Sequence, residues 1–122
     1  MGKVYAVQDV VKRDFKTGDM VSTMDFRKAL SYGEVELLLS HGRVGFTPGP
    51  TIDTLKEKLR NFSYEDYLIP TGDPAAIAIA SMIAGEANMG RVKMLKWDRD
   101  SKNYIEIQID LNYRRNQRKE EN

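Results

Sequence analysis

The chain has 122 residues, of which 41% are hydrophobic and 30% are charged, and its formal net charge is +1. This length and composition are typical of a single soluble globular domain that can bury a core. The absence of cysteine excludes a disulfide, a thiolate nucleophile and a cysteine-based zinc site. The small net charge excludes a global attraction to nucleic acid or to a membrane, so any such attraction would have to be local.

The sequence shows no targeting or membrane-spanning segment. No stretch reaches the roughly 18 apolar residues that suggest a membrane span. Charged residues interrupt the apolar residues at the N-terminus, which therefore does not resemble a signal peptide. We expect a cytoplasmic protein without a membrane partner.

The first predicted elements form an N-terminal hairpin. Residues 3–11 (KVYAVQDVV) are β-branched and aromatic and predict a strand. A turn that contains Gly18 follows, and residues 20–26 (MVSTMDF) predict a short return strand. The pattern leaves open whether this hairpin joins the main sheet.

The next elements are a short helical turn over residues 25–33, a buried strand over residues 34–40 (EVELLLS) and a longer helix. Thr51 is the predicted N-cap of that helix, and Asp53 is expected in its first turn, where the helix dipole favours a negative charge. Apolar side chains spaced for one helical face follow: Ile52, Leu55, Leu59 and Phe62.

The following helix has clear signals at its start. Residues 67–72 (YLIPTG) predict a strand that runs into a turn. Asp73 is the predicted N-cap, and Pro74 occupies the first helical position, where proline is favoured. We expect this helix to run to about residue 87.

The last two strands, residues 91–98 and 103–111, form a predicted hairpin around RDSK, and the second of them alternates apolar and polar residues. Residues 112–122 are polar and are expected to be a disordered tail. The order of elements predicts an α/β fold in a single domain over residues 1–111. Its mixed sheet has a β-α-β-α-β centre, parallel central strands and antiparallel hairpins at both ends.

The turn of Thr71, Gly72 and Asp73 is the predicted ligand-binding site. It lies at the carboxyl end of a predicted parallel strand, where ligands of open α/β sheets gather. Pro74 removes one N–H donor and the Asp73 carboxylate repels an anion, so Thr71 and Asp73 suit hydroxyls, amines or a metal ion better than phosphate. The alternative is a structural joint whose carboxylate only caps the helix.

The helix after this turn is apolar on every side, with Ser81 as the only polar residue between positions 75 and 84. A helix of this kind is expected to be covered all round, either within the monomer or by a partner chain. The predicted interface residues for a homodimer or another protein are Ala76, Ile79, Ala80 and Ile83.

Basic residues near the C-terminus suggest a nucleic-acid surface. Trp97 lies near the last hairpin, and a base could stack on it, as on the aromatic residues that bind single strands. The alternatives are a solvated tail and a core position for Trp97. The predicted contacts are Lys93, Lys96, Arg99, Arg114 and Arg115.

The sequence contains no recognisable catalytic set. His41 is the only histidine, and without a cysteine or a serine in a nucleophile elbow it has no obvious partner, so we interpret it as a loop residue. We assign no catalytic residue, no metal ligand and no cofactor.

The segment order and two stretches, GDPAAI at residues 72–77 and KMLKWD at residues 93–98, resemble a family of small open reading frames of tailed bacteriophages. The resemblance extends from residue 3 to residue 111 and carries no catalytic motif. It implies a viral origin and action in the host cytoplasm, where phage proteins of this size often act as binders.

These observations favour a non-enzymatic phage accessory protein that binds a host or phage protein as a homodimer. Two alternatives remain open. One is a nucleic-acid-binding accessory factor in phage replication, and the other is a small-molecule or nucleotide binder at residues 71–73.

Overall fold

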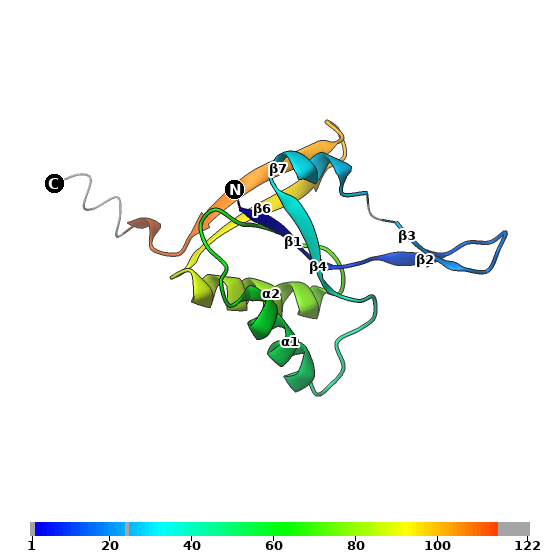
Figure 1. Cartoon of the computed structure of the whole chain (residues 1–122), viewed down its shortest axis with the longest axis horizontal. Helices are drawn as coiled ribbons and strands as arrows, with labels where there is room; N and C mark the ends of the chain where they lie inside the picture. The colour runs from blue at the N-terminus through cyan, green and yellow to red at the C-terminus, as the bar shows by residue number, and fades with distance from the viewer. Residues whose placement is uncertain (1, 24, 115–122) are drawn as a thin grey trace.

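The computed structural model describes residues 2–23 and 25–114, which form one five-stranded sheet, two α-helices, a short 3-10 helix (η1) and a two-stranded arm (Figure 1). In chain order the elements are β1 (Lys3–Gln8), β2 (Val11–Arg13), β3 (Met20–Ser22), η1 (Arg27–Ser31), β4 (Glu34–Leu39), α1 (Gly49–Leu59), β5 (Tyr67–Ile69), α2 (Pro74–Ala87), β6 (Arg91–Asp98) and β7 (Asn103–Asp110).

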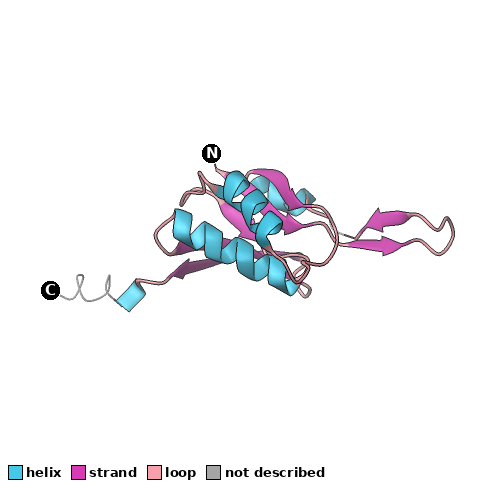
Figure 2. Cartoon of the chain, turned by 90° about the horizontal axis from the view of Figure 1, so that it is seen from below, coloured by secondary structure: helices cyan, strands magenta, loops and turns pink. Residues whose placement is uncertain are grey.

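The main sheet has the strand order β4-β1-β5-β6-β7. The first four strands are parallel to one another, and β7 is antiparallel to β6. Figure 2 shows α1 and α2 side by side on one face of the sheet. This arrangement confirms the predicted α/β fold with a mixed sheet, and the parallel centre follows from the helical crossovers.

The strand β1 lies between β4 and β5 and is buried on both faces, because its side chains alternate between two apolar clusters. Tyr5 and Val7 face the helices, where they join Leu38, Leu55, Leu59, Leu68 and Val92. Val4 and Ala6 face the opposite side, where η1 contributes Ala29 and where Ile69, Leu95 and Tyr104 also pack.

The N-terminal hairpin forms, but it stands apart from the main sheet. The first strand ends at Gln8 instead of continuing to residue 11, and β2 and β3 pair only with each other. Figures 1 and 2 show this arm, residues 11–22, projecting away from the body. Hydrogen bonds hold its base: the Ser22 hydroxyl donates to Asp9 Oδ1 at 2.6 Å, and the N–H and hydroxyl of Thr23 both donate to Val10 O, at 2.7 and 2.9 Å.

The predicted start of α1 was wrong. The helix begins at Gly49 with Pro48 at the N-cap and no side-chain cap, so Thr51 lies inside the first turn and Asp53 lies beyond it. Pro50 is compatible with this earlier start because the first helical turn needs no N–H from it. Leu55 and Leu59, two of the four side chains predicted on its apolar face, are fully buried.

The predicted start of α2 is confirmed. Pro74 is the first helical residue, and Asp73 Oδ1 accepts a hydrogen bond from the Ala75 N–H at 3.0 Å. The predicted tail begins at residue 112, and its residues 115–122 lie outside the described part of the chain.

Candidate functional site

The carboxyl ends of β1 and β5 form a topological switch point. The chain leaves β1 toward β4 on one side, whereas it leaves β5 toward β6 on the other side. Adjacent parallel strands whose connections diverge in this way open a crevice, and ligands of α/β sheets bind there. The structure has a crevice of about 740 Å³ at this point, lined by Gln8, Asp9, Val10, Val11, Met20, His41, Gly42, Arg43, Gly72, Asp73 and Pro74.

Gln8 holds the floor of the crevice together. Its side chain is 5% exposed. Its amide nitrogen donates to Ser40 O at 2.8 Å and to Gly42 O at 2.6 Å, and its Oε1 accepts from the Asp73 N–H at 2.8 Å. One buried side chain therefore joins the ends of β1, β4 and β5, because a buried amide must find partners for its donors and acceptor.

The predicted ligand turn lies beside this crevice, and its polar side chains are bonded within the chain. The Thr71 hydroxyl donates to Gln8 O at 2.8 Å, and Asp73 Oδ2 accepts from the Val44 N–H at 2.8 Å. Gly72 has φ of 108°, and a side chain there would collide with the Gln8 side chain. These bonds give all three residues a structural role; ligand binding by them remains a prediction.

The Asp73 carboxylate is held in its charged form. The backbone N–H groups of Val44 and Ala75 donate to it, and Arg43 lies nearby, so the pKa of Asp73 is lower than its ordinary value. A negative charge at this helix N-terminus also compensates the helix dipole. The carboxylate thus fastens the loop after β4 to the start of α2.

The walls of the crevice carry residues that the sequence did not single out as a set. His41 and Arg43 are exposed on the loop between β4 and α1, and Val11 and Met20 come from the two strands of the arm. The sequence analysis did not single out Gln8, although a signal was present: Gln8 is a polar residue directly after the apolar run Val4 to Val7, and it is the last residue of β1.

Large apolar side chains are exposed on the arm and on the loop between β4 and α1. Phe15, at the tip of the arm, is 93% exposed, and Phe46, on the loop between β4 and α1, is fully exposed. Met20 and Val21 on β3 are also about half exposed, at 51% and 45%. Figure 1 shows that the arm and this loop project from the same end of the molecule.

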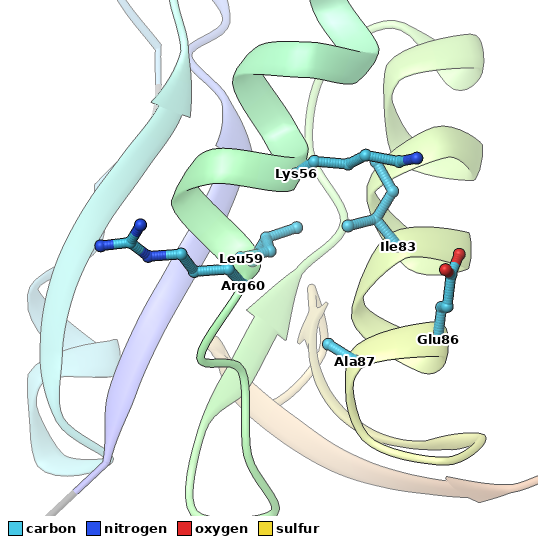
Figure 3. Close-up of a pocket in the computed structure, with 6 residues that line it drawn as sticks. All are labelled: Lys56, Leu59, Arg60, Ile83, Glu86 and Ala87. Carbon is cyan, nitrogen blue, oxygen red and sulfur yellow. The ribbon is translucent and has the colours of Figure 1, made fainter.

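The predicted interface residues on α2 lie mainly toward the chain's own core. Ala76 and Ala80 are fully buried and Ile83 is 9% exposed, whereas Met82, on the outer side of the helix, is 72% exposed. Figure 3 shows Lys56 of α1 reaching over Ile83, beside a shallow hollow of about 230 Å³ between the two helices. Ile79 is half-buried and packs at the edge of the same core.

The structure does not bring the predicted nucleic-acid residues together. The Lys93 Nζ lies 4.2 Å from the centre of the Tyr67 ring. Lys96, three residues further along β6, points to the opposite face of the sheet. Arg99 follows β6 in the hairpin turn, whereas Arg114 follows the other end of β7 (Figure 1). Arg115 lies outside the described residues.

The described residues show neither a metal-binding cluster nor a membrane-spanning helix. Residues 2–23 and 25–114 contain no group of three or more acidic or histidine side chains that could hold a metal ion. No helix in the same ranges is long and apolar enough to cross a membrane.

Comparison with known proteins places the chain in a phage family. No curated protein and no solved structure gives a significant match. The sequence does match one protein family over residues 2–111, nearly the whole chain, which confirms the resemblance to phage open reading frames. The chain therefore belongs to the family described as Phage Pam3 gp32-like protein.

Proposed function

We propose that this phage protein is an accessory factor that binds another protein in the cytoplasm of the infected host, and that it does so as a homodimer. The observation that supports protein binding best is the arm, with Phe15 exposed at its tip. Met20 and Val21 on the same arm are exposed as well, and exposed apolar patches are typical of protein-binding surfaces.

The arm is expected to be more stable when a protein partner covers it than when it is exposed to solvent. An isolated two-stranded hairpin is only marginally stable, and this one pairs three residues on each side. Its tip turns at Gly18, whose φ of 75° suits glycine, and the Gly18 N–H donates to Asp14 O at 2.7 Å. A partner that covers both strands would stabilise the arm and bury Phe15.

Phe46 offers a second exposed aromatic side chain, on the loop whose residues His41 and Arg43 line the crevice. Burial of one phenylalanine side chain contributes roughly 1.5–3 kcal/mol. Loss of one such contact is expected to weaken binding roughly tenfold to a hundredfold. Lys12, Arg13 and Lys16 alternate with Asp14 and Asp19 on the arm, so the contact is expected to be apolar with a mixed polar rim.

Capture from a lysate of infected host cells tests this function. We expect Phe15→Ser and Phe46→Ser each to reduce recovery of a partner that the unaltered chain retains, with no change in melting temperature. Met82→Ser is the matched control, because it removes an exposed apolar side chain from α2. The proposal fails if the two phenylalanine variants recover the same proteins in the same amounts.

The crevice supports a second candidate function, which is the binding of a small molecule. Its volume of about 740 Å³ lies within the range of about 300–1,000 Å³ typical of ligand sites. Because Gln8, Thr71 and Asp73 are bonded within the chain, Arg43 and His41 are the wall residues best placed to contact a ligand. A thermal-shift screen of nucleotides and metal ions tests it. A response abolished by Arg43→Ala would support the site, and no response to any compound would count against it.

A further inference from the structure

Within residues 2–23 and 25–114, the outer edge of β7 is an open sheet edge. β7 is the last strand of the main sheet, and its eight residues pair with β6 in a continuous register without a bulge. No other strand in the described ranges pairs with it. Exposed strand edges invite pairing with another chain, and proteins usually blunt them with lysine, proline, bulges or short strands. The sequence of β7, NYIEIQID, contains no lysine, arginine or proline.

The opposite edge of the sheet is protected, which makes β7 distinctive. Leu39 O accepts from the Asp9 N–H and therefore faces β1, so the Leu38 carbonyl points outward from β4. Lys58 Nζ donates to that carbonyl at 2.8 Å. A lysine side chain from α1 thus occupies the outer edge of β4.

The hydrogen bonds at both ends of β7 show which backbone groups face outward. The Tyr104 N–H bonds to the side chain of Asn103 instead of to β6, whereas the Leu111 N–H bonds to Gly90 O at the start of β6. Because strand residues alternate, the backbone groups of Glu106 and Gln108 face away from β6.

We propose that a second copy of this chain pairs with β7 in antiparallel fashion, so that Ile107 lies opposite Ile107 of the partner subunit. The two five-stranded sheets then form one continuous sheet across a two-fold axis. This inference gives the proposed homodimer its surface, and it does not depend on the arm or on the partner that the arm binds.

The charges on β7 select this register. In a continuous sheet, two residues that lie opposite each other must point to the same face. This condition excludes the antiparallel self-pairing that overlaps all eight residues of β7, and it leaves two that overlap seven. One of them sets Glu106 against Glu106 of the partner subunit, and opposed like charges are destabilising. The other sets Glu106 against Gln108 of the partner subunit, where the amide can donate to the carboxylate.

The same register matches the apolar side chains. Ile107 is 39% exposed and Ile105 is 48% exposed on the side of the sheet that carries the helices. Pairing sets Ile107 against its own copy and Ile105 against Ile109 of the partner subunit, and such β-branched pairs stabilise antiparallel strands. Both isoleucines therefore lose solvent exposure in the dimer.

Cysteine cross-linking of the full chain tests the register, because the sequence has no cysteine of its own. Ile107→Cys is expected to form a covalent dimer on mild oxidation. Ile105→Cys is the matched control on the same strand and face. In the proposed register its two copies lie four residues apart, about 14 Å along the strand, which is too far for a disulfide.

Sedimentation of the unaltered chain and of a charge variant completes the test. We expect a dimer mass, and Gln108→Glu should raise the dimer dissociation constant on the order of tenfold, since it opposes two pairs of carboxylates. Adding Glu106→Gln should restore dimerisation. A monomer mass at the highest attainable concentration, or equal cross-linking of Ile105→Cys and Ile107→Cys, would overturn the proposal.

Discussion

Two polar side chains, Gln8 and Asp73, determine how the carboxyl end of the sheet is held. Gln8 bonds to the ends of two neighbouring segments, and Asp73 bonds both to its own helix and to the loop after β4. These hydrogen bonds fix the backbone at the bottom of the crevice, whereas His41 and Arg43 on its walls are exposed. Gln8 and Asp73 thus have structural roles, and the proposed ligand contacts fall to other residues of the crevice.

Gln8→Leu is expected to lower the free energy of unfolding by about 1–3 kcal/mol. The substitution keeps the side-chain size and leaves the Asp73 N–H without its acceptor and two carbonyls without a donor. Urea unfolding measures this change. Asn61→Leu is the control, because it replaces an amide at an exposed position and should change stability little. An equal effect of the two variants would refute the structural role of Gln8.

The stability contributed by Asp73 should depend on pH. Its pKa in the folded chain is lowered from an ordinary value of 3.8 by the Val44 and Ala75 N–H groups. The contribution is therefore fully present above about pH 4 and is lost as the pH falls through the lowered pKa. Melting temperatures measured from neutral pH to about pH 3 should fall more steeply for the unaltered chain than for Asp73→Asn. Parallel curves would show that the carboxylate contributes nothing.

The sequence correctly predicted Asp73 as a helix N-cap, but it did not predict the role of Gln8. The reason is how far apart in the sequence their contacts lie. A helix cap involves residues within one turn, so the pair Asp73 and Pro74 is sufficient to identify it. The Gln8 contacts join segments separated by 32 to 65 positions, and only the strand order brings those segments together. Arg43 and Met20 were missed for the same reason.

The two helices differ in how clearly their ends are encoded. The start of α2 has a capping carboxylate followed by proline, whereas α1 begins without a side-chain cap in a loop rich in glycine and proline. Thr51 was a plausible cap by residue type, but the preceding Pro48 and Gly49 allow the helix to start earlier. For α1 the hydrophobic spacing was the more dependable signal, because Leu55 and Leu59 are buried as predicted.

The two sides of α2 should respond differently to the same substitution. Ala80 is fully buried against the sheet and α1, while Ala78 is exposed. Ala80→Leu is expected to lower the free energy of unfolding by about 1–3 kcal/mol through overpacking, and Ala78→Leu should have little effect. Denaturant titration distinguishes them, and equal stabilities would mean that α2 is not packed as described.

At the scale of the whole molecule, the order of elements was predictable and their spatial arrangement was not. The pattern of strands and helices predicted a mixed sheet with a parallel centre, and the structure confirms it. The position of β1 between β4 and β5, the separation of the arm and the free edge of β7 depend on non-local pairing. The crevice, the proposed partner surface and the proposed dimer surface depend on these three features.

Removal of the arm gives the most direct test of the proposed function. A chain in which a two-residue turn joins Val10 to Thr23 should keep its circular dichroism spectrum and most of its melting temperature. This is expected because the arm forms a sheet of its own and its base is already closed by a Thr23 to Val10 hydrogen bond. The same chain should lose the partner that the full chain captures from infected cells. Undiminished capture by the folded, armless chain would contradict the account.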